Sequence, residues 1–476
     1  MKTVLVSGMF NVLHPGHVRL LRFASECGDH LIVAVQSDKT SDQSSHVNEQ
    51  LRLEGVQSNT YVDESFLTDD DAVDLVRALK PDVLVKGREH ENRQNPEEKI
   101  LAEYGGKLLF DSGEVYFSSL DLLEKEFEQS VNLSGQMPYD FMKRHNVKVT
   151  QLSDYIEKFS NLKIAVIGDL IMDEYIICDP LGMSQEDPTI VVTPIDNEVF
   201  IGGAGIVAAH AASLGAEVKL ISVVGNDSLC EKANEMLIKA NVNPFLIKDE
   251  HRQTTLKQRY RTREKTLLRV SHLHQSDINK HIQKIMIDEF RKIIFDIDLL
   301  VFSDFNYGCL PDYVVNEMIQ LAKEKKVFIA ADSQSSSQIG DISRYRNVDL
   351  LTPTEREARI AVRDHNSGLV VLAEYLRKKT DVKNILLKLG EEGVLIHAFI
   401  EDEPGYLTDQ IQALKSNPKD VSGAGDSMLI TSAMTLSLGG KIWQAALIGS
   451  VAAALQVSRL GNRPLEVEEL HLAVRG

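Results

Sequence analysis

The hydrophobic positions in the first part of the chain form short continuous apolar runs that alternate with longer amphipathic segments. Residues 3–8, 30–38, 81–87 and 107–111 predict strands, and residues 17–28, 71–80, 97–106 and 118–129 predict helices. Strands that are apolar throughout are typical of a parallel sheet covered by helices on both faces. We therefore predict an α/β domain over residues 1–128.

This pattern is interrupted over residues 129–160, where Ser, Gly and Pro occur without a clear hydrophobic period. We predict a linker there, ending in a connecting helix near 152–160. The alternation restarts at NLKIAVIGD and predicts a second α/β domain over residues 161–476. Its predicted strands lie in residues 219–225, 298–304, 327–333, 349–354 and 384–390.

Two stretches of the second domain have a different period. Residues 189–200 and 254–271 alternate with a period near two, which indicates half-exposed antiparallel strands. They predict a small β lid on the second domain.

Composition narrows the class of partner. The chain has 476 residues and a net charge of −18, which disfavours nonspecific binding to nucleic acid or to an anionic membrane. Its longest late apolar run, residues 445–455, is too short to span a bilayer, and no secretory signal is recognisable. The four scattered cysteines predict free thiols in a reducing cytoplasm. We expect a cytoplasmic protein with no nucleic-acid or membrane partner.

The segment GMFNVLHPGH places two histidines where the first strand meets the first helix. Ligands of open α/β sheets bind at such turns, where a helix N-terminus attracts anions. His14 and His17 could each donate to a phosphate oxygen, and Gly16 would let the backbone approach the ligand. The alternative is a turn with two solvent-exposed histidines.

This segment resembles the G-x-F-D-x-x-H-x-G-H pattern of the HxGH nucleotidyltransferases, which transfer a nucleoside monophosphate from ATP or CTP. The resemblance implies a Rossmann-like fold, nucleotide contacts by Gly8, Phe10 and Gly16, and phosphate contacts by His14 and His17. The chain departs from the pattern at Asn11, where the family usually has Asp.

Other positions fit the same family. Lys86 follows an apolar strand and could reach a phosphate as a point charge. Ser118 and Ser119 match the hydroxyl-rich turn of the family, although they could equally cap a helix. Arg52 is a further candidate for a family arginine.

A second motif, DVSGAGDSMLITSAMTLSL, begins at Asp420. Gly423, Ala424 and Gly425 precede an apolar helix and would leave amides free for an anion. Asp426 would then lie beside the reacting phosphoryl group and could take a proton from an attacking hydroxyl. The alternative is a glycine-rich turn with an Asp cap.

The motif resembles the D-T-x-G-A-G-D signature of ribokinase-like sugar kinases, and the resemblance extends over about residues 160–476. It implies that an acceptor sugar contacts Asp169, Asp173, Gly202 and Gly203. It also implies that Glu357 organises Mg²⁺ through water.

The chain departs from the kinase pattern at two positions: Ile206 and Thr354 stand where many members carry Asn. Lys257 and Arg259 lie on one face of a predicted lid strand, where they could hold a phosphate of the acceptor. A solvated charged face is the alternative. The family also implies a homo-oligomer, with a dimer formed through the kinase lid.

Together the two domains resemble the family of bifunctional heptose 7-phosphate kinase/heptose 1-phosphate adenylyltransferases, with the domain order reversed. The resemblance implies sugar phosphate and nucleotide as substrates, ATP and Mg²⁺ as requirements, and ADP-heptose as product. Two alternatives remain open. One is a kinase/cytidylyltransferase that uses CTP and another sugar or polyol phosphate; the other is an active kinase with a transferase domain that only binds.

Overall fold

The chain forms two compact units. The computed structural model describes residues 2–10, 15–38, 48–87, 90, 95–111, 137–184, 186–187, 189–262, 265–335, 340–399, 406–414 and 419–475. The first unit comprises Met1–Val131, Asn366–Glu374 and Thr408–Gln410, and the second comprises Asn132–His365, Tyr375–Leu407 and Ile411–Gly476.

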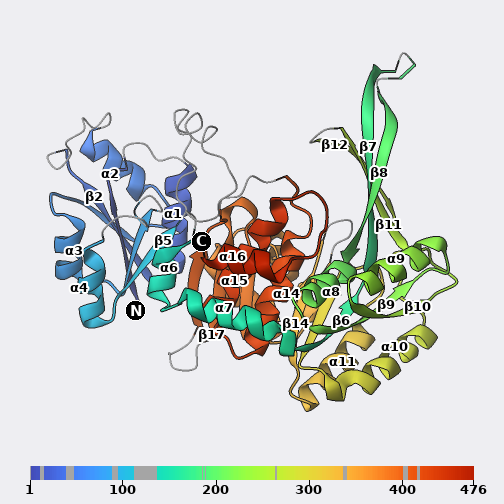
Figure 1. Cartoon of the computed structure of the whole chain (residues 1–476). Helices are drawn as coiled ribbons and strands as arrows, with labels where there is room; N and C mark the ends of the chain where they lie inside the picture. The colour runs from blue at the N-terminus through green and yellow to red at the C-terminus, as the bar shows by residue number, and fades with distance from the viewer. Residues whose placement is uncertain are drawn as a thin grey trace. The chain divides into compact units, whose positions relative to one another are not determined.

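The first unit contains a parallel five-stranded sheet with the order β3-β2-β1-β4-β5. Its strands are β1 (Thr3–Gly8), β2 (His30–Gln36), β3 (Glu64–Thr68), β4 (Val83–Gly87) and β5 (Lys107–Asp111). Its helices are α1 (Pro15–Glu26), α2 (Glu49–Gln57), α3 (Ala72–Leu79) and α4 (Glu97–Tyr104) (Figure 1).

The sequence predicted most of this unit. The four predicted strands and the first three predicted helices are confirmed. Apolar residues of the strands, α3 and α4 form a core around Leu5, Leu84 and Leu108, and α1 buries Leu21. Neither β3 nor α2 was predicted from the sequence. Most residues of β3 are only half buried or exposed, and α2 contains a glycine, so neither gives a strong hydrophobic signal. The predicted helix at 118–129 lies outside the described residues.

The second unit is built on a nine-stranded sheet with the order β10-β9-β6-β13-β14-β15-β16-β17-β18. Neighbouring strands from β10 to β16 are parallel, and β17 runs antiparallel to β16. The strands are β6 (Lys163–Gly168), β9 (Glu217–Val224), β10 (Val242–Lys248), β13 (Leu299–Asp304), β14 (Phe328–Ser333), β15 (Leu350–Leu351), β16 (Asn384–Lys388), β17 (Val394–Phe399) and β18 (Tyr406–Ile411).

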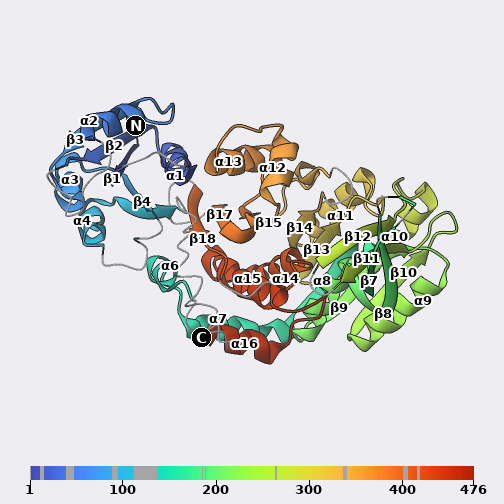
Figure 2. The same cartoon turned by 90° about the horizontal axis from the view of Figure 1, so that it is seen from above.

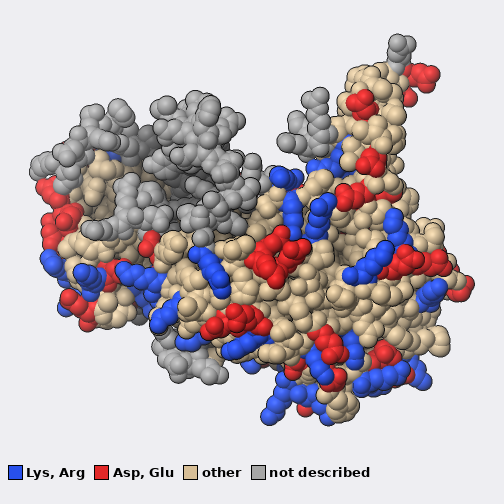
Figure 3. All heavy atoms as spheres, viewed as in Figure 1, with Lys and Arg blue, Asp and Glu red and all other residues tan. Residues whose placement is uncertain are grey.

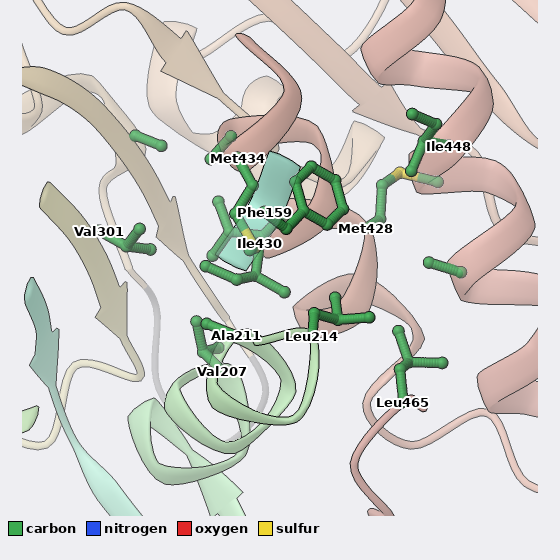
Figure 4. Close-up of a cluster of buried hydrophobic side chains, with 14 of the residues drawn as sticks. Phe159, Val207, Ala211, Leu214, Val301, Met428, Ile430, Met434, Ile448 and Leu465 are labelled. Atoms are coloured by element: carbon green, nitrogen blue, oxygen red, sulfur yellow. The ribbon is translucent and has the colours of Figure 1, made fainter. Parts of the chain in front are cut away.

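Helices lie against this sheet, as Figure 2 shows from above, and their apolar side chains form the main hydrophobic core together with those of the strands. They are α6 (Tyr139–Arg144), α7 (Val149–Lys158), α8 (Ala204–Ser213), α9 (Ser228–Lys239), α10 (Lys280–Ile293), α11 (Asp312–Glu324), α12 (Glu355–Val362), α13 (Leu369–Thr380), α14 (Ala424–Ser437), α15 (Ile442–Val457) and α16 (Val467–Arg475). Figure 4 shows side chains of α8, α14 and α15, among them Val207, Ile430 and Ile448, packed in this core. The core fixes α14, whose first turn carries the second motif.

The segment predicted as linker and connecting helix contributes to the same core. Phe141, Leu152 and Phe159 are fully buried, and the Phe141 ring packs edge-on against Trp443 of α15. Residues 137–160 are therefore an integral layer of the second unit.

A separate four-stranded sheet, β12-β11-β7-β8, matches the predicted lid. It contains β7 (Leu170–Met183), β8 (Ile190–Gly203), β11 (Thr255–Thr262) and β12 (Lys265–His272). In Figure 1, β7 and β8 extend from the body of the second unit as a long two-stranded ribbon. Both antiparallel pairs agree with the predicted period of two, and β7 and β11 join them in parallel.

The surface carries both signs of charge. Acidic and basic side chains are intermingled over the described surface in Figure 3. The four cysteines are buried, and Cys178, Cys230 and Cys309 are free thiols, as the sequence predicted. Among the described residues, no helix has the length and apolar character needed to cross a membrane.

Candidate active sites

The first candidate site lies at the carboxyl ends of β1 and β4. The two strands pair in parallel with Val6 opposite Val85, so Gly8 and Lys86 emerge at the same edge. In the order β3-β2-β1-β4-β5, successive strands are added on one side of β1 up to β3 and on the other side from β4 onward. Ligands of open α/β sheets bind at such switch points.

Three residues of the first motif are close together at this edge. Phe10 is buried and adopts a left-handed conformation with φ of +50°. Its ring centroid lies 5.2 Å from that of His17 in α1, and a Cβ at Gly8 would lie 3.3 Å from the Phe10 ring. Gly16 belongs to the first turn of α1. Asn11, His14, Ser118 and Ser119 lie outside the described residues.

Lys86 is paired with a neighbouring carboxylate. Its Nζ lies 2.9 Å from Glu97 Oε1 and 3.0 Å from Asn95 Oδ1, and its side chain is 15% exposed. Glu97 lies in the first turn of α4 and is itself buried. A phosphate that binds Lys86 must therefore compete with Glu97.

Arg52 fixes the shape of this site from α2. Its buried guanidinium donates to the carbonyl oxygens of Met9 and Gln36 and to Asp38 Oδ1. It therefore connects the turn after β1 to the end of β2. We infer that Arg52 positions the turn after β1, which begins the first motif.

The second candidate site is centred on the N-terminus of α14. Gly423 precedes the helix with φ of +77°, and Ala424 and Gly425 occupy its first turn. Asp426 follows in the same turn and is 5% exposed. Burial, reinforced by the nearby Asp332 charge, raises the pKa of Asp426 to about 7. A carboxylate with this pKa is suited to accept a proton near neutral pH.

Three side chains of neighbouring strands surround Asp426. Gln334 Nε2 donates to Asp426 Oδ1 at 3.0 Å, and Lys388 Nζ donates to Asp332 Oδ2 at 2.8 Å. Burial raises the pKa of Asp332 to about 6, although Lys388 opposes the shift. Asp332 Oδ1 has no hydrogen-bond partner in the described part of the chain.

Glu357 and Thr354 form the N-terminus of α12. Glu357 Oε1 accepts from Ser335 N at 2.8 Å, and its Oε2 accepts from Thr354 N at 2.7 Å. Thr354 Oγ1 accepts from Glu357 N in return, which completes a capping box. Thr354 therefore supplies the helix cap at the position where Asn is usual.

A cavity of about 660 Å³ opens beside this cluster. Thr354, Arg356, Lys388 and Gly390 are among the residues that line it. A nucleotide needs a cleft of this order and cations for its phosphates. The cavity is the candidate nucleotide site of the second unit.

Asp173 lies at the base of the lid with unsatisfied polar atoms around it. Its Oδ2 accepts from Asn462 Nδ2 at 3.2 Å, and its Oδ1 lies 3.5 Å from Arg259 Nη2. Asp173 Oδ1, Arg259 Nε and Asn462 Oδ1 make no hydrogen bond within the described chain. Burial raises the pKa of Asp173, while Arg259 and Lys257 oppose the shift. A ligand with several hydroxyls could satisfy these atoms.

The remaining predicted acceptor residues surround Asp173. A Cβ at Gly202 would lie 2.3 Å from Asp173 Oδ2, which explains the need for glycine there. Lys257 lies opposite Asp173 in the β7–β11 pair, and its Nζ lies 4.7 Å from the centroid of the Phe305 ring. Ile206 is buried in the hydrophobic core.

Asp169 holds a loop from within the protein. It is 3% exposed and accepts hydrogen bonds from the backbone amides of Phe305, Tyr307 and Cys309. Burial, with the Asp304 charge, raises its pKa to about 6. Gly203, with φ of +60°, starts α8 beside the Asp169 backbone.

Four residues of the second site were missed in the sequence: Asp332, Gln334, Lys388 and Asn462. Lys388 and Asp332 each lie at or near the end of an apolar strand at the ligand edge of the sheet, and this position was the available signal. Asn462 follows a glycine in the C-terminal segment and had no comparable signal.

The sequence profile described as pfkB family carbohydrate kinase matches residues 161–468. The chain belongs to the pfkB family of carbohydrate kinases. The matched span includes most of the second unit, which we call the pfkB unit from here on. A second profile, described as cytidylyltransferase-like, matches residues 5–106 of the first unit.

Relatives of the pfkB unit include two proteins named Bifunctional protein HldE. The protein from Helicobacter hepaticus is 30% identical over 308 residues, which is 63% of this chain and 61% of the relative. The protein from Pseudomonas fluorescens is 29% identical over 67% of this chain and 65% of the relative. The chain thus spans less than two thirds of the length of these relatives.

Solved structures share the fold of the pfkB unit. Arabidopsis thaliana ribokinase complexed with ribose and ATP superposes with a TM-score of 0.52 at 17% identity, covering 66% of this chain and 99% of that one. Escherichia coli phosphofructokinase-2 superposes with a TM-score of 0.53 at 16% identity, covering 66% of this chain and 98% of that one.

Proposed function

We propose that the chain is a bifunctional enzyme that makes a nucleotide-activated sugar. The pfkB unit would phosphorylate heptose 7-phosphate at its anomeric hydroxyl with ATP. The first unit would transfer AMP from ATP to the heptose 1-phosphate that remains after a separate phosphatase removes the 7-phosphate. The proposal rests chiefly on Asp426, a buried carboxylate with a near-neutral pKa at an anion-binding helix terminus.

In the first reaction, the acceptor hydroxyl lies near Asp173 and its oxygen attacks the γ-phosphorus of ATP. The hydroxyl proton moves to Asp426, and the bond from the γ-phosphorus to the bridging oxygen breaks. The electron pair of this bond leaves with ADP. Backbone amides at Gly425 and the helix terminus would stabilise the phosphoryl charge.

Mg²⁺ is expected to accompany the nucleotide. The described residues contain no group of three His, Cys, Asp or Glu side chains that could hold a metal by themselves. The unpartnered oxygen of Asp332, with Glu357 nearby, fits an ion that takes most of its ligands from phosphates and water. When bound there, Mg²⁺ would neutralise phosphate charge.

In the second reaction, a phosphate oxygen of the sugar 1-phosphate attacks the α-phosphorus of ATP. The bond between the α-phosphorus and the bridging oxygen breaks, and pyrophosphate leaves with its electron pair. His14, His17 and Lys86 would donate to the phosphates, with Gly8, Phe10 and Gly16 shaping the turn. CTP remains the alternative nucleotide. The Lys86–Glu97 ion pair favours one further alternative, a first unit that binds nucleotide without turnover.

The lid suggests a second copy of the chain as partner. Leu181, Met183, Ile190 and Ile195 of β7 and β8 are each more than half exposed, which is unusual for large apolar side chains in a ribbon. A dimer formed through the lid would bury them. The free buried thiols of Cys178, Cys230 and Cys309 agree with a cytoplasmic location.

Phosphorus NMR of the purified protein tests the function. The first tube holds Mg²⁺, ATP and D-glycero-D-manno-heptose 7-phosphate; a second adds a phosphatase, and a third replaces ATP with CTP. We expect an anomeric phosphate in the first tube, then ADP-sugar and pyrophosphate in the second. An anomeric phosphate without any nucleotide sugar would support the binding-only alternative. No anomeric phosphate would exclude this acceptor.

A further inference from the structure

Lys388 is a cation at the centre of the pfkB site that none of the sequence motifs identified. It ends β16, lines the 660 Å³ cavity, and is 13% exposed. Its Nζ lies 2.8 Å from Asp332 Oδ2, and a Cβ at Gly425 would lie 3.1 Å from the same Nζ. The ammonium therefore borders both the cavity and the turn that would receive the phosphoryl group.

Acidic side chains surround the Lys388 ammonium. Its ammonium donates to Asp332 Oδ2 and lies near the Glu357 and Asp426 carboxylates. Asp332 keeps one oxygen unpartnered among the described residues, although it is 1% exposed. This is the oxygen that fits Mg²⁺, so a metal-bound nucleotide would neutralise Asp332 when Lys388 turns to the phosphate.

Resting on the proposed kinase function, we propose that Lys388 is the cationic group that binds the terminal phosphate of ATP during phosphoryl transfer. On nucleotide binding, its ammonium exchanges the Asp332 oxygen for a phosphate oxygen. Phosphoryl transfer depends on positioning and on neutralising charge, and lysine does this as a point charge. Gln334 contacts both Asp332 and Asp426 but carries no charge to contribute.

Initial rates of phosphoryl transfer by the full chain report the pfkB site alone; with Mg²⁺ present, varied ATP and ADP as competing product give the affinity of this site for each nucleotide and test this role. We expect the wild type to bind ATP more tightly than ADP. Lys388→Met should remove this preference by weakening ATP binding about tenfold or more, and should lower kcat about 100-fold. Lys383→Met is the matched control, because Lys383 directly precedes β16 and is 69% exposed. An equal loss for both nucleotides, or no preference in the wild type, would overturn the proposal.

Lys388→Met leaves Asp332 buried without its partner and could reduce stability. The double variant Asp332→Asn/Lys388→Met removes that charge and should fold while still showing no preference for ATP. Gln334→Lys/Lys388→Gln moves the cation instead. Because Gln334 Nε2 lies 3.5 Å from the same Asp332 oxygen, we expect this exchange to recover at least about tenfold of the lost kcat. A folded exchange variant as inactive as Lys388→Met contradicts the charge argument.

The outcomes separate this inference from the proposed function. A wild type that binds neither nucleotide and phosphorylates no heptose 7-phosphate would contradict the kinase function itself. A wild type that does both, together with a Lys388→Met variant of unchanged nucleotide preference and kcat, would contradict the role of Lys388 alone.

Discussion

Each unit places one lysine at the ligand edge of its sheet, and the two lysines differ in how they are neutralised. Lys86 in the first unit pairs with one carboxylate, Glu97, and with the amide of Asn95. Lys388 in the pfkB unit pairs with Asp332 and lies in the field of Glu357 and Asp426 as well. The first lysine is held by its own strand–helix connection, and the second by an electrostatic cluster built from several elements.

Breaking the buried ion pair at the ligand edge therefore has different electrostatic consequences in the two units. Among the described residues Lys86 contacts one carboxylate, Glu97, and a phosphate must compete with it. Lys388 would leave a cluster that still contains other acidic groups, so its departure exposes more negative charge. The pfkB site therefore has the stronger need for a cation that enters with the ligand.

Asp426→Asn should have the largest effect on the pfkB unit and leave the first unit active. The variant keeps the shape of the side chain but removes the base, so we expect phosphoryl transfer to fall about 1,000-fold. Pyrophosphate release from the first unit should stay within about twofold of wild type, because that unit uses no residue of α14. Separate assays of ADP and pyrophosphate measure the two reactions. Loss of both in a folded variant would refute the two-site description.

His17→Ala should give the opposite result with a smaller effect. We expect nucleotidyl transfer to fall about 100-fold because one phosphate donor is lost, while phosphoryl transfer is unchanged. His30→Ala is the control in the same unit, since His30 starts β2 beside the Glu64 carboxylate. Equal losses in the two histidine variants would argue against a specific role for His17.

The Lys86–Glu97 pair can be dissected by combining variants. Lys86→Met strands a buried carboxylate, so we expect a loss of about 3 kcal/mol of unfolding free energy and about tenfold or more of nucleotidyl transfer. Lys86→Met/Glu97→Gln should regain most of the stability but none of the activity. Denaturant unfolding and pyrophosphate release measure these two effects. Recovery of activity in the double variant would mean that Lys86 has only a structural role.

The pH dependence of phosphoryl transfer should report Asp426. Its pKa is raised from 3.8 to about 7, so kcat/KM should rise about tenfold per pH unit below pH 7 and level off above it. The folded state favours the protonated form, so the corresponding contribution to stability is fully present below pH 3.8 and is lost as pH rises towards 7. Because Lys388 lowers this pKa, Lys388→Met should move the limb to higher pH. A flat profile would exclude Asp426 as the base.

The smallest effect is expected from Asn462→Ala. Loss of its hydrogen bond to Asp173 should raise the KM for the acceptor about tenfold and leave the KM for ATP unchanged. Arg463→Ala is a matched control, because the Arg463 side chain is 56% exposed in an ion pair with Glu198. Initial rates at varied acceptor and fixed ATP give the comparison. A change in both KM values would assign Asn462 to the phosphate turn instead.

Most of the correct predictions rest on short stretches of residues that are neighbours in the sequence. The apolar runs predicted β1, β2, β4 and β5 of the first sheet and β6, β9 and β13 to β16 of the second, because burial on both faces demands continuous hydrophobic residues. The strands β3, β10, β17 and β18 were not predicted. The two motifs predicted the glycine turns and the position of Asp426 because the residues of each motif are neighbours along the chain. The capping box of Thr354 and Glu357 is also local, but the predicted strand over residues 349–354 included Thr354, which caps α12 instead.

Contacts between distant strands could not be predicted in this way. Lys388 and Asp332 are 56 positions apart, and their meeting depends on the order β14-β15-β16. Asn462 and Asp173 are 289 positions apart and meet only when the C-terminal segment packs beside the lid. The sequence also could not show that Lys86 is paired, or that the Asp169 carboxylate is bonded to a backbone loop.

The packing of residues 137–160 decides how this enzyme can be divided in the laboratory. His145 stacks on Trp443 at 3.8 Å between ring centroids, and Gln151 accepts a hydrogen bond from Gln444. An expression fragment that starts at residue 161 would leave the faces of α15 and α16 uncovered and would be prone to aggregate. A fragment that starts just before Met137 keeps this layer and is the sound choice for assaying the pfkB unit alone.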